Sequence, residues 1–347
     1  MLPSGFPVYG ANGKIGFYSE YNHENSTILI TCRGATCGSI NVCEPKSYAT
    51  GNSMALDDLD EEKVDLAFLV AALKGANFSS IITGVAQPQI TRQSLARLKI
   101  PLPPLSEQKR IAGILDAADR LRAKRRAALA QLDTLLQSTF LDLFGDPVTN
   151  PKGWEVVRVR DLLESANYGT SKKADIEKGA FPVLRMNNIT YEGAWNFTSL
   201  KYMDLEDKEL PKHLVHKGQI LFNRTNSKEL VGKTAVFREE TPMAFAGYLV
   251  RGITNELADP EYIGAYMNTP QTKQRLRNMC KNIVGMANIN AQEFQKVPIQ
   301  KPPLTLQQRF AAIVDQVEAQ KARMRTQLTE LDTLFAALQQ RAFNGEL

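Results

Sequence analysis

The sequence contains one long phrase twice, and this internal repeat constrains the fold more than any other feature. The stretch "IPLPPLSEQKRIAGILDAADRL" begins at Ile100, and "IQKPPLTLQQRFAAIVDQVEAQ" begins at Ile299, 199 residues later (299 minus 100). The same offset aligns two copies of the motif "LDTL", at 132–135 and 331–334, without a gap. Chance cannot plausibly produce so long a match, so the chain is an internal duplication of a whole domain and the segment that follows it.

Each copy of the repeat predicts a long helix that begins after a Pro-Pro pair, because prolines cannot continue a helix and the residue before them favours extended backbone. Apolar residues then recur at the a and d positions of a heptad, which is typical of a coiled-coil seam. Polar residues interrupt this pattern at Arg125, Gln320 and Gln327. The predicted seam residues are Ile111, Ile114, Leu121, Leu132, Leu135, Phe310, Ile313, Val317, Met324, Leu331 and Leu334.

We expect the two helices to pair with each other in antiparallel orientation, although each could instead pack only on its own domain. Both copies carry the same seam, and neither has a neighbouring helix of similar length. A helix of about 30 residues is about 45 Å long, which suits a spacer. The predicted fold class is therefore α+β, with two mixed α/β domains, each followed by a long helix, and with the two halves related by a pseudo-two-fold axis.

The segments before the helices contain short extended runs separated by Gly, Asn and Pro, which predicts mixed α/β modules. Both modules contain "FPV", and Arg33 and Arg224 fall in comparable loops after a strand. The second module opens with an element that has no counterpart in the first, so we expect the first module to be shortened at its N-terminus. The predicted segments are a first module at 1–104, a helix at 105–145, a second module at 146–303, a helix at 304–342 and a tail at 343–347.

Composition narrows the class of protein. The 347 residues are 43% apolar and 23% charged, no apolar run reaches membrane-spanning length, and no secretory signal is present. The four cysteines (Cys32, Cys37, Cys43 and Cys280) lack zinc-ligand spacing and are interpreted as reduced thiols of a cytoplasmic protein. The net charge of +5 suits a polyanionic partner. No catalytic motif is found, since the "GKT" at 232–234 has serine where a phosphate loop needs its first glycine.

The repeated boundary "PPLSEQKR" and "PPLTLQQR", each followed by a long helix, and the junction "FGDPVTNPKGWEVVRVRDLL" at 144–163 carry a family resemblance. Over essentially the whole chain, the sequence resembles the DNA-specificity (S) subunit of Type I restriction–modification systems. The resemblance implies two target-recognition domains on double-stranded DNA, each reading one half of a split target, and no catalysis or cofactor of the chain's own. It also implies two methyltransferase (M) subunits that methylate adenine and restriction (R) subunits, with S-adenosylmethionine, ATP and magnesium on these partners.

Base reading in a DNA groove needs Arg or Lys for guanine and Asn or Gln for adenine. The candidates in the first module are Lys14, Arg33, Gln87, Gln89 and Arg92. The candidates in the second module are Lys172, Lys173, Arg185, Asn187, Asn188, Arg224, Asn226, Lys228 and Lys233. Asn288 and Asn290 flank the repeated Ile289, so structural capping is the favoured role for both.

Two alternatives remain at this point. Between Glu107 and Arg126 there are seven basic and three acidic residues, and this helix flank either tracks phosphates or is a solvated face or subunit interface. The whole chain is either a DNA-recognition subunit or a non-catalytic coiled-coil scaffold, such as a degenerate S subunit that binds M subunits without productive DNA reading. The sequence does not give the recognised bases.

Overall fold

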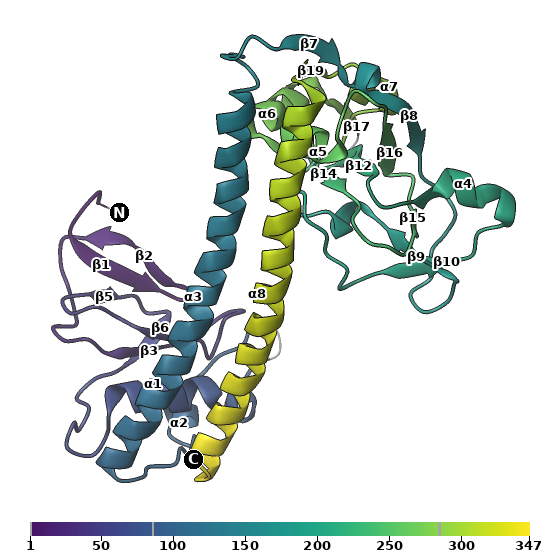
Figure 1. Ribbon diagram of the computed structural model, residues 1–347. Coiled ribbons are helices and arrows are strands. Elements are labelled where there is room, and N and C mark those ends of the chain that lie inside the picture. The colour runs from purple at the N-terminus through teal and green to yellow at the C-terminus, as the bar shows by residue number, and fades with distance from the viewer. Residues whose placement is uncertain (1, 85–86, 284–285) are drawn as a thin grey trace. The chain divides into compact units, whose positions relative to one another are not determined.

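Figure 1 shows the computed structural model, in which two long helices accompany two groups of strands and short helices. The structure describes residues 2–84, 87–283 and 286–347. The chain forms two compact units: unit 1 combines the residues up to Ala128 with Met324–Leu347, and unit 2 comprises Leu129–Arg323. The long helices α3 (Leu105–Phe144) and α8 (Leu304–Asn344) each contribute one part to each unit. The functional division of the chain into recognition modules and spacers stays a prediction.

Unit 1 stacks a helix, a sheet and a second sheet. Its elements are β1 (Phe6–Gly10), β2 (Gly13–Tyr18), β3 (Ile28–Thr31), β4 (Ile40–Val42), β5 (Tyr48–Ala49), β6 (Ser53–Leu56), α1 (Leu66–Gly75) and α2 (Arg92–Leu95). Strand β3 is central in the sheet β4-β3-β6 and is buried on both faces. Ile28 and Ile30 pack with Leu69 and Leu73 of α1, whereas Leu29 packs towards the sheet β2-β1-β5.

Unit 2 has the same layers with more strands. Its strands are β7 (Glu155–Arg158), β8 (Leu163–Tyr168), β9 (Phe181–Leu184), β10 (Lys201–Met203), β11 (Leu214–Val215), β12 (Ile220–Asn223), β13 (Thr225–Asn226), β14 (Thr234–Val236), β15 (Met243–Phe245), β16 (Leu249–Thr254), β17 (Lys281–Ile283), β18 (Met286–Asn288) and β19 (Pro298–Lys301). Its short helices are α4 (Leu210–His213), α5 (Pro260–Asn268), α6 (Pro270–Met279) and α7 (Ala291–Gln295). Ile220 and Phe222 of the buried β12 pack in the core that contains α5, and Leu221 faces the sheet β10-β9-β15-β11.

The strand pairings show that the two modules are homologous. Each "FPV" strand, β1 or β9, pairs in parallel with a later strand, β5 or β15, and antiparallel with the next strand, β2 or β10. The central strands β3 and β12 each lie between two antiparallel neighbours. Unit 2 adds β8 to the edge at β16, whereas β6 is the corresponding edge in the described part of unit 1. The reason for this difference, including the expected shortening of the first module, stays a prediction.

The long helices run antiparallel where they meet in unit 1. Arg110 Nη2 donates a hydrogen bond to the backbone oxygen of Leu347, and Arg122 Nε lies 2.6 Å from Asp332 Oδ1. Moving forward along α3 therefore means moving backward along α8. Arg122 also lies 2.7 Å from Asp119, one turn earlier on its own helix.

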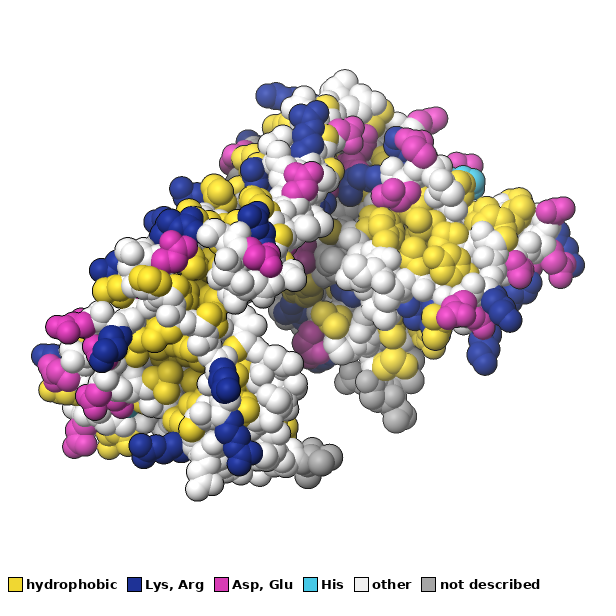
Figure 2. Space-filling model, turned by 90° about the horizontal axis from the view of Figure 1, so that it is seen from below, with side chains coloured by type: hydrophobic (Ala, Val, Ile, Leu, Met, Phe, Trp, Pro, Cys, Tyr) yellow, Lys and Arg dark blue, Asp and Glu magenta, His cyan; other side chains and the backbone are white. Residues whose placement is uncertain are grey.

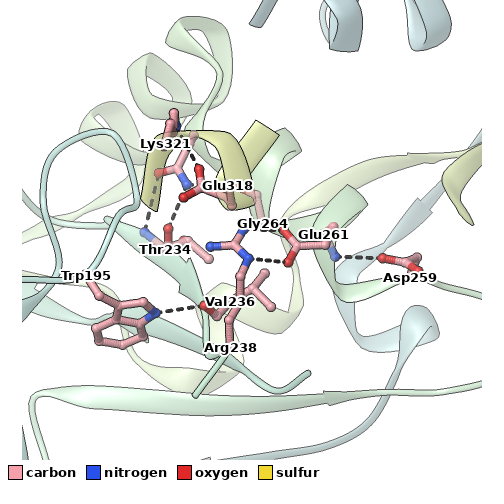
Figure 3. A network of polar contacts seen from close by, with 10 residues as sticks. Trp195, Thr234, Val236, Arg238, Asp259, Glu261, Gly264, Glu318 and Lys321 are labelled. Carbon is pink, nitrogen blue, oxygen red and sulfur yellow. Dashed lines mark hydrogen bonds and ion pairs between the residues drawn. The ribbon is translucent and has the colours of Figure 1, made fainter. Parts of the chain in front are cut away.

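The same orientation holds where the helices meet in unit 2. Lys321 of α8 is only 4% exposed, and its Nζ lies 2.6 Å from Asp133 of α3 and 2.7 Å from Glu318 on its own helix. Figure 3 shows Lys321 beside Glu318. Further along α3, the rings of Phe140 and Phe310 pack edge to face with centroids 5.6 Å apart.

The 199-residue offset relates these two clusters of charges, since it maps Arg122 onto Lys321 and Asp133 onto Asp332. In each unit, a basic residue in the seam binds the aspartate of the "LDTL" motif of the other helix. This contact gives a physical reason for the repetition of that motif. The predicted fold class, two mixed α/β modules with paired antiparallel helices, is confirmed; the pseudo-two-fold axis stays a prediction.

The helix seam differs from the predicted one by one residue at alternate positions. Leu121, Leu135 and Leu334 are 53%, 47% and 50% exposed, so their assignment to the seam is wrong, and Ile114 and Ile313 are half-buried. Buried or half-buried residues follow a strict heptad instead: Ile111, Leu115, Ala118, Arg122, Arg125, Leu129, Leu132 and Leu136 on α3, and Phe310, Val314, Val317, Lys321, Met324, Leu328, Leu331, Phe335 and Leu338 on α8. Arg122 and Lys321 occupy two of these seam positions, so a prediction based on apolar residues alone chooses a neighbouring position, such as Leu121 in place of Arg122.

A buried glutamine joins each long helix to its module. Its side-chain oxygen accepts a hydrogen bond from the backbone of the aspartate that caps α1 or α5, and its amide donates to two backbone carbonyls. Gln108 bonds Asp65 N, Lys63 O and Pro103 O at 2.9, 2.8 and 2.8 Å, and Gln307 bonds Asp259 N, Leu257 O and Pro302 O at 2.9, 3.2 and 2.9 Å. Both glutamines have no exposed surface. The repeated "PPLxxQ" phrase is therefore a joint that fixes the direction in which the helix leaves its module.

Candidate nucleic-acid interface

In unit 2, several polar and aromatic residues meet where the chain leaves the central strand β12. The backbone N–H of Arg224 donates to Tyr248 O at 3.0 Å, and Arg224 O accepts from Ile289 N at 2.9 Å. The next two residues form β13, which pairs antiparallel with β18. Because β12 is buried on both faces, its end is held rigidly, and the residues that follow it are displayed at one edge of the sheet.

The side chain of Arg224 is held in one orientation by its neighbours. Its guanidinium lies over the ring of Tyr168 at 4.8 Å, within cation–π range. Nη1 donates to Gly247 O at 3.3 Å and Nη2 to Asn288 Oδ1 at 3.5 Å, both longer than an ordinary N–H···O bond. Nε is buried and has no hydrogen-bond partner. Tyr168 is itself fixed, because its hydroxyl accepts from the backbone N–H of Ala291 at 2.8 Å.

Exposed apolar side chains surround this arginine. Tyr168 and Tyr248 are 41% and 48% exposed, and Met286 of β18 is exposed as well. The amide of Asn288 donates to Thr225 Oγ1 at 2.7 Å, so the prediction that Asn288 is a capping residue is wrong. Asn290 does cap α7, through its side-chain oxygen, as predicted. Aromatic rings, an arginine and amides at one exposed edge are the groups that proteins use to contact bases.

Unit 1 has a corresponding edge at the end of β3. Ile90 N donates to Cys32 O at 3.0 Å, as Ile289 N does to Arg224 O, and the two isoleucines are separated by the repeat offset. Cys32 is therefore the counterpart of Arg224, and Arg33 is the counterpart of the residue that follows Arg224. Arg33 forms an antiparallel backbone bridge with Gln89, which is the counterpart of Asn288. Unit 1 thus brings together predicted candidates from two distant segments at the end of its central strand, and unit 2 brings the candidate Arg224 together with Asn288, which was not among the candidates.

The structure places the remaining candidates elsewhere, and two of them point inward. Asn188 is buried, accepts from Arg185 N and donates to Asn196 O. Lys233 is buried and donates to the carbonyls of Met186 and Ile189, and burial lowers the pKa of its ammonium group. Because both side chains are buried and bonded to internal carbonyls, Asn188 and Lys233 are left out of the interface.

The other candidates lie at the surface, several of them in local contacts. Lys172 lies 2.6 Å from Glu209, whose hydrogen bond raises the pKa of the lysine. Lys14 lies 3.1 Å from Glu44, and Arg185 Nη2 donates to Ser199 O. Gln87, Arg92, Lys173, Asn187 and Lys228 are exposed, and Asn226 is half-buried in β13. Their roles in binding stay predictions.

Four of the seven basic residues of the α3 flank are paired with nearby carboxylates. Arg110, Arg120, Arg122 and Arg126 lie within 3.0 Å of Glu107, Asp116, Asp119 or Asp332. Figure 2 shows the same mixture on the face it presents, where Lys and Arg side chains are scattered among acidic ones. These pairs favour the interpretation of this flank as a charged, solvated face over that of a phosphate track.

Within residues 2–84, 87–283 and 286–347, no group of three or more His, Cys, Asp or Glu side chains is arranged to hold a metal ion. In the same described segments, no helix is both long and apolar enough to cross a bilayer.

The model of the Type I restriction modification DNA specificity domain matches residues 3–131 and again residues 151–333. The chain belongs to this family. The double match agrees with the internal repeat, because each copy of the domain contains one module and most of its helix.

Individual relatives and solved structures agree with this membership. The EcoKI specificity subunit of Escherichia coli is 24% identical over 81% of this chain and 64% of its own length, so the chain spans less than two thirds of that relative. A putative type I restriction enzyme specificity subunit of Haemophilus influenzae is 23% identical over 90% of this chain and 80% of its own. The crystal structure of the S subunit from M. genitalium shares the fold, with a TM-score of 0.61 and 17% identity over 99% of this chain and 90% of that one.

Proposed function

We propose that this chain is the sequence-specific DNA-recognition subunit of a Type I restriction–modification complex and is not itself catalytic. Each module reads one half of a bipartite target in double-stranded DNA. The observation that carries this proposal is the duplication: two homologous modules each display Arg, Asn or Gln at the end of a rigid central strand, before a long helix. A single reading surface would not require a second copy of the whole unit.

The paired helices have two tasks in this proposal. They separate the half-sites by a set length, and they bind the partner subunits. The exposed Leu121 and Leu135 are two heptads apart on α3 and lie outside the seam with α8. Apolar residues at heptad spacing on an exposed helix face suit packing against a further helix. We therefore assign this face to the methyltransferase subunits.

The chemistry of the complex belongs to the partners in this proposal. Two methyltransferase subunits would bind S-adenosylmethionine, and restriction subunits would use ATP and magnesium. A complex of this kind acts on DNA inside the cell, so we place it in the cytoplasm.

Competition binding separates this function from that of a scaffold. The full chain is co-expressed with its methyltransferase partner, and the purified complex is titrated onto labelled genomic fragments at fixed salt, since phosphate contacts make affinity salt-dependent. We expect a subset of fragments to resist competition by random DNA. Equal competition by every fragment would support a coiled-coil scaffold or a degenerate subunit instead.

A further inference from the structure

We infer that Arg224 reads a guanine in the half-site of the second module, with Tyr168 and Asn288 as the residues that position it. This inference rests on the proposed function and names the base and the residue through which unit 2 would act. Among the described residues, Arg224 is the only candidate arginine whose guanidinium lies over an aromatic ring; Lys14 is the other basic candidate with such a contact, to Phe17.

The geometry orients the fork of donors before any DNA is present. The guanidinium carbon of Arg224 lies 4.8 Å from the centre of the Tyr168 ring, and the hydroxyl of the same tyrosine is anchored at the start of α7. Asn288 and Gly247 touch its two Nη atoms. A side chain held in this way loses little conformational entropy on binding, which favours a specific contact with a base over a non-specific electrostatic one.

The existing bonds of Arg224 are weak enough to be replaced. Distances of 3.3 and 3.5 Å lie beyond the usual 2.7–3.2 Å range for N–H···O bonds. A pair of acceptors spaced like O6 and N7 of guanine would give the same donors shorter bonds, since this bidentate match is specific to the major-groove edge of guanine.

The first module lacks this arrangement. The position equivalent to Arg224 is Cys32, and the described part of unit 1 has no strand at the place of β8, which supplies Tyr168. The two half-sites should therefore depend on different residues. A change at Arg224 should affect bases in one half-site only.

The test is a selection from a library of duplex DNA with randomised positions, using the full chain in complex with its methyltransferase subunit. The variants are Arg224→Gln, which removes both the charge and the pair of donors that suits guanine, and Lys228→Ala as a control in the same exposed loop. We expect Arg224→Gln to lose preference for guanine at one position by about 10- to 100-fold, the range of one bidentate pair, and to leave the other half-site unchanged. Lys228→Ala should weaken binding about equally for all sequences.

A second pair of variants tests the positioning role without touching the arginine. Tyr168→Phe keeps the ring, whereas Tyr168→Leu removes the stacking surface. Only the leucine variant should relax the same position, and thermal melting establishes that both variants are folded. If Tyr168→Leu is unfolded, the result for Arg224→Gln decides alone.

Two results would overturn the inference. A uniform loss of affinity for all sequences in Arg224→Gln would make Arg224 a phosphate contact, and an unchanged motif would remove it from the interface. Failure of the proposed function would be distinguishable from both results, because the wild-type complex would then select no motif at all.

Discussion

Replacing Gln307 by leucine tests whether the buried glutamine is the joint between helix and module. Leucine keeps most of the volume but leaves the N–H of Asp259 and the carbonyls of Leu257 and Pro302 without the partners they have at 2.9–3.2 Å. Each buried group left unpaired costs about 1 kcal/mol or more, so we expect a loss of about 3 kcal/mol in unit 2. The matched control is Gln308→Leu, one residue further along and exposed, which should change stability by less than about 0.5 kcal/mol.

Hydrogen exchange measured by mass spectrometry suits this prediction, because it reports each unit separately. A loss of about 3 kcal/mol corresponds to exchange about 100-fold faster in peptides from α5 and the start of α8 when opening is shared by the unit. Gln108→Leu should do the same in unit 1 around α1. If α5 in Gln307→Leu exchanged no faster than in Gln308→Leu, the three bonds would not be the joint, and the reasoning would be refuted.

Three further predictions concern other parts of the chain. Lys321→Met leaves Asp133 without its seam partner and should lower the unfolding free energy of unit 2, measured by urea unfolding, by about 1–3 kcal/mol. The control Arg120→Met breaks an exposed ion pair and should lower it by less than about 1 kcal/mol. Equal losses in the two variants would contradict a role of Lys321 in the seam. Leu121→Lys should leave the melting temperature unchanged but reduce co-purification with the methyltransferase subunit, and normal co-purification would remove this face from the interface. Burial lowers the pKa of Lys273 to about 8, below its value in the unfolded chain, so the unfolded chain binds more protons than the folded one above pH 8. The unfolding free energy of the wild type should therefore rise relative to that of Lys273→Met as pH increases from about 8 to about 10.5. A difference between the two proteins that stays constant over this range would contradict the prediction.

The repeat allowed the fold class to be predicted because it is a relation between residues of the sequence itself. Two segments that share the same boundary phrase must share a fold, and a helix that contains a heptad needs a partner. The register of the seam could not be predicted from apolar residues alone. Position 122 is an arginine and position 321 a lysine, and each lies in the seam beside an aspartate of the opposite helix, while Arg122 also lies over the ring of Phe335.

The candidate site was predictable in its residue types but not in its arrangement. Arg224 and Asn226 follow a buried strand, and that local pattern is visible in the sequence. Tyr168 lies 56 residues earlier (224 minus 168), and its contact with Arg224 depends on the pairing of β8 with β16. The inward orientation of Lys233 likewise depends on carbonyls of a distant turn, so no local pattern could separate it from an exposed lysine.

The most direct test of the account is the map of methylated adenines in cells that express this chain with a methyltransferase subunit and no other modification system. We expect a single split motif, with two specified half-sites separated by a gap of fixed length and unspecified sequence. Methylation at contiguous or unrelated sites, or at two half-sites with a variable gap, would contradict the claim that two homologous modules read DNA at a distance set by the paired helices.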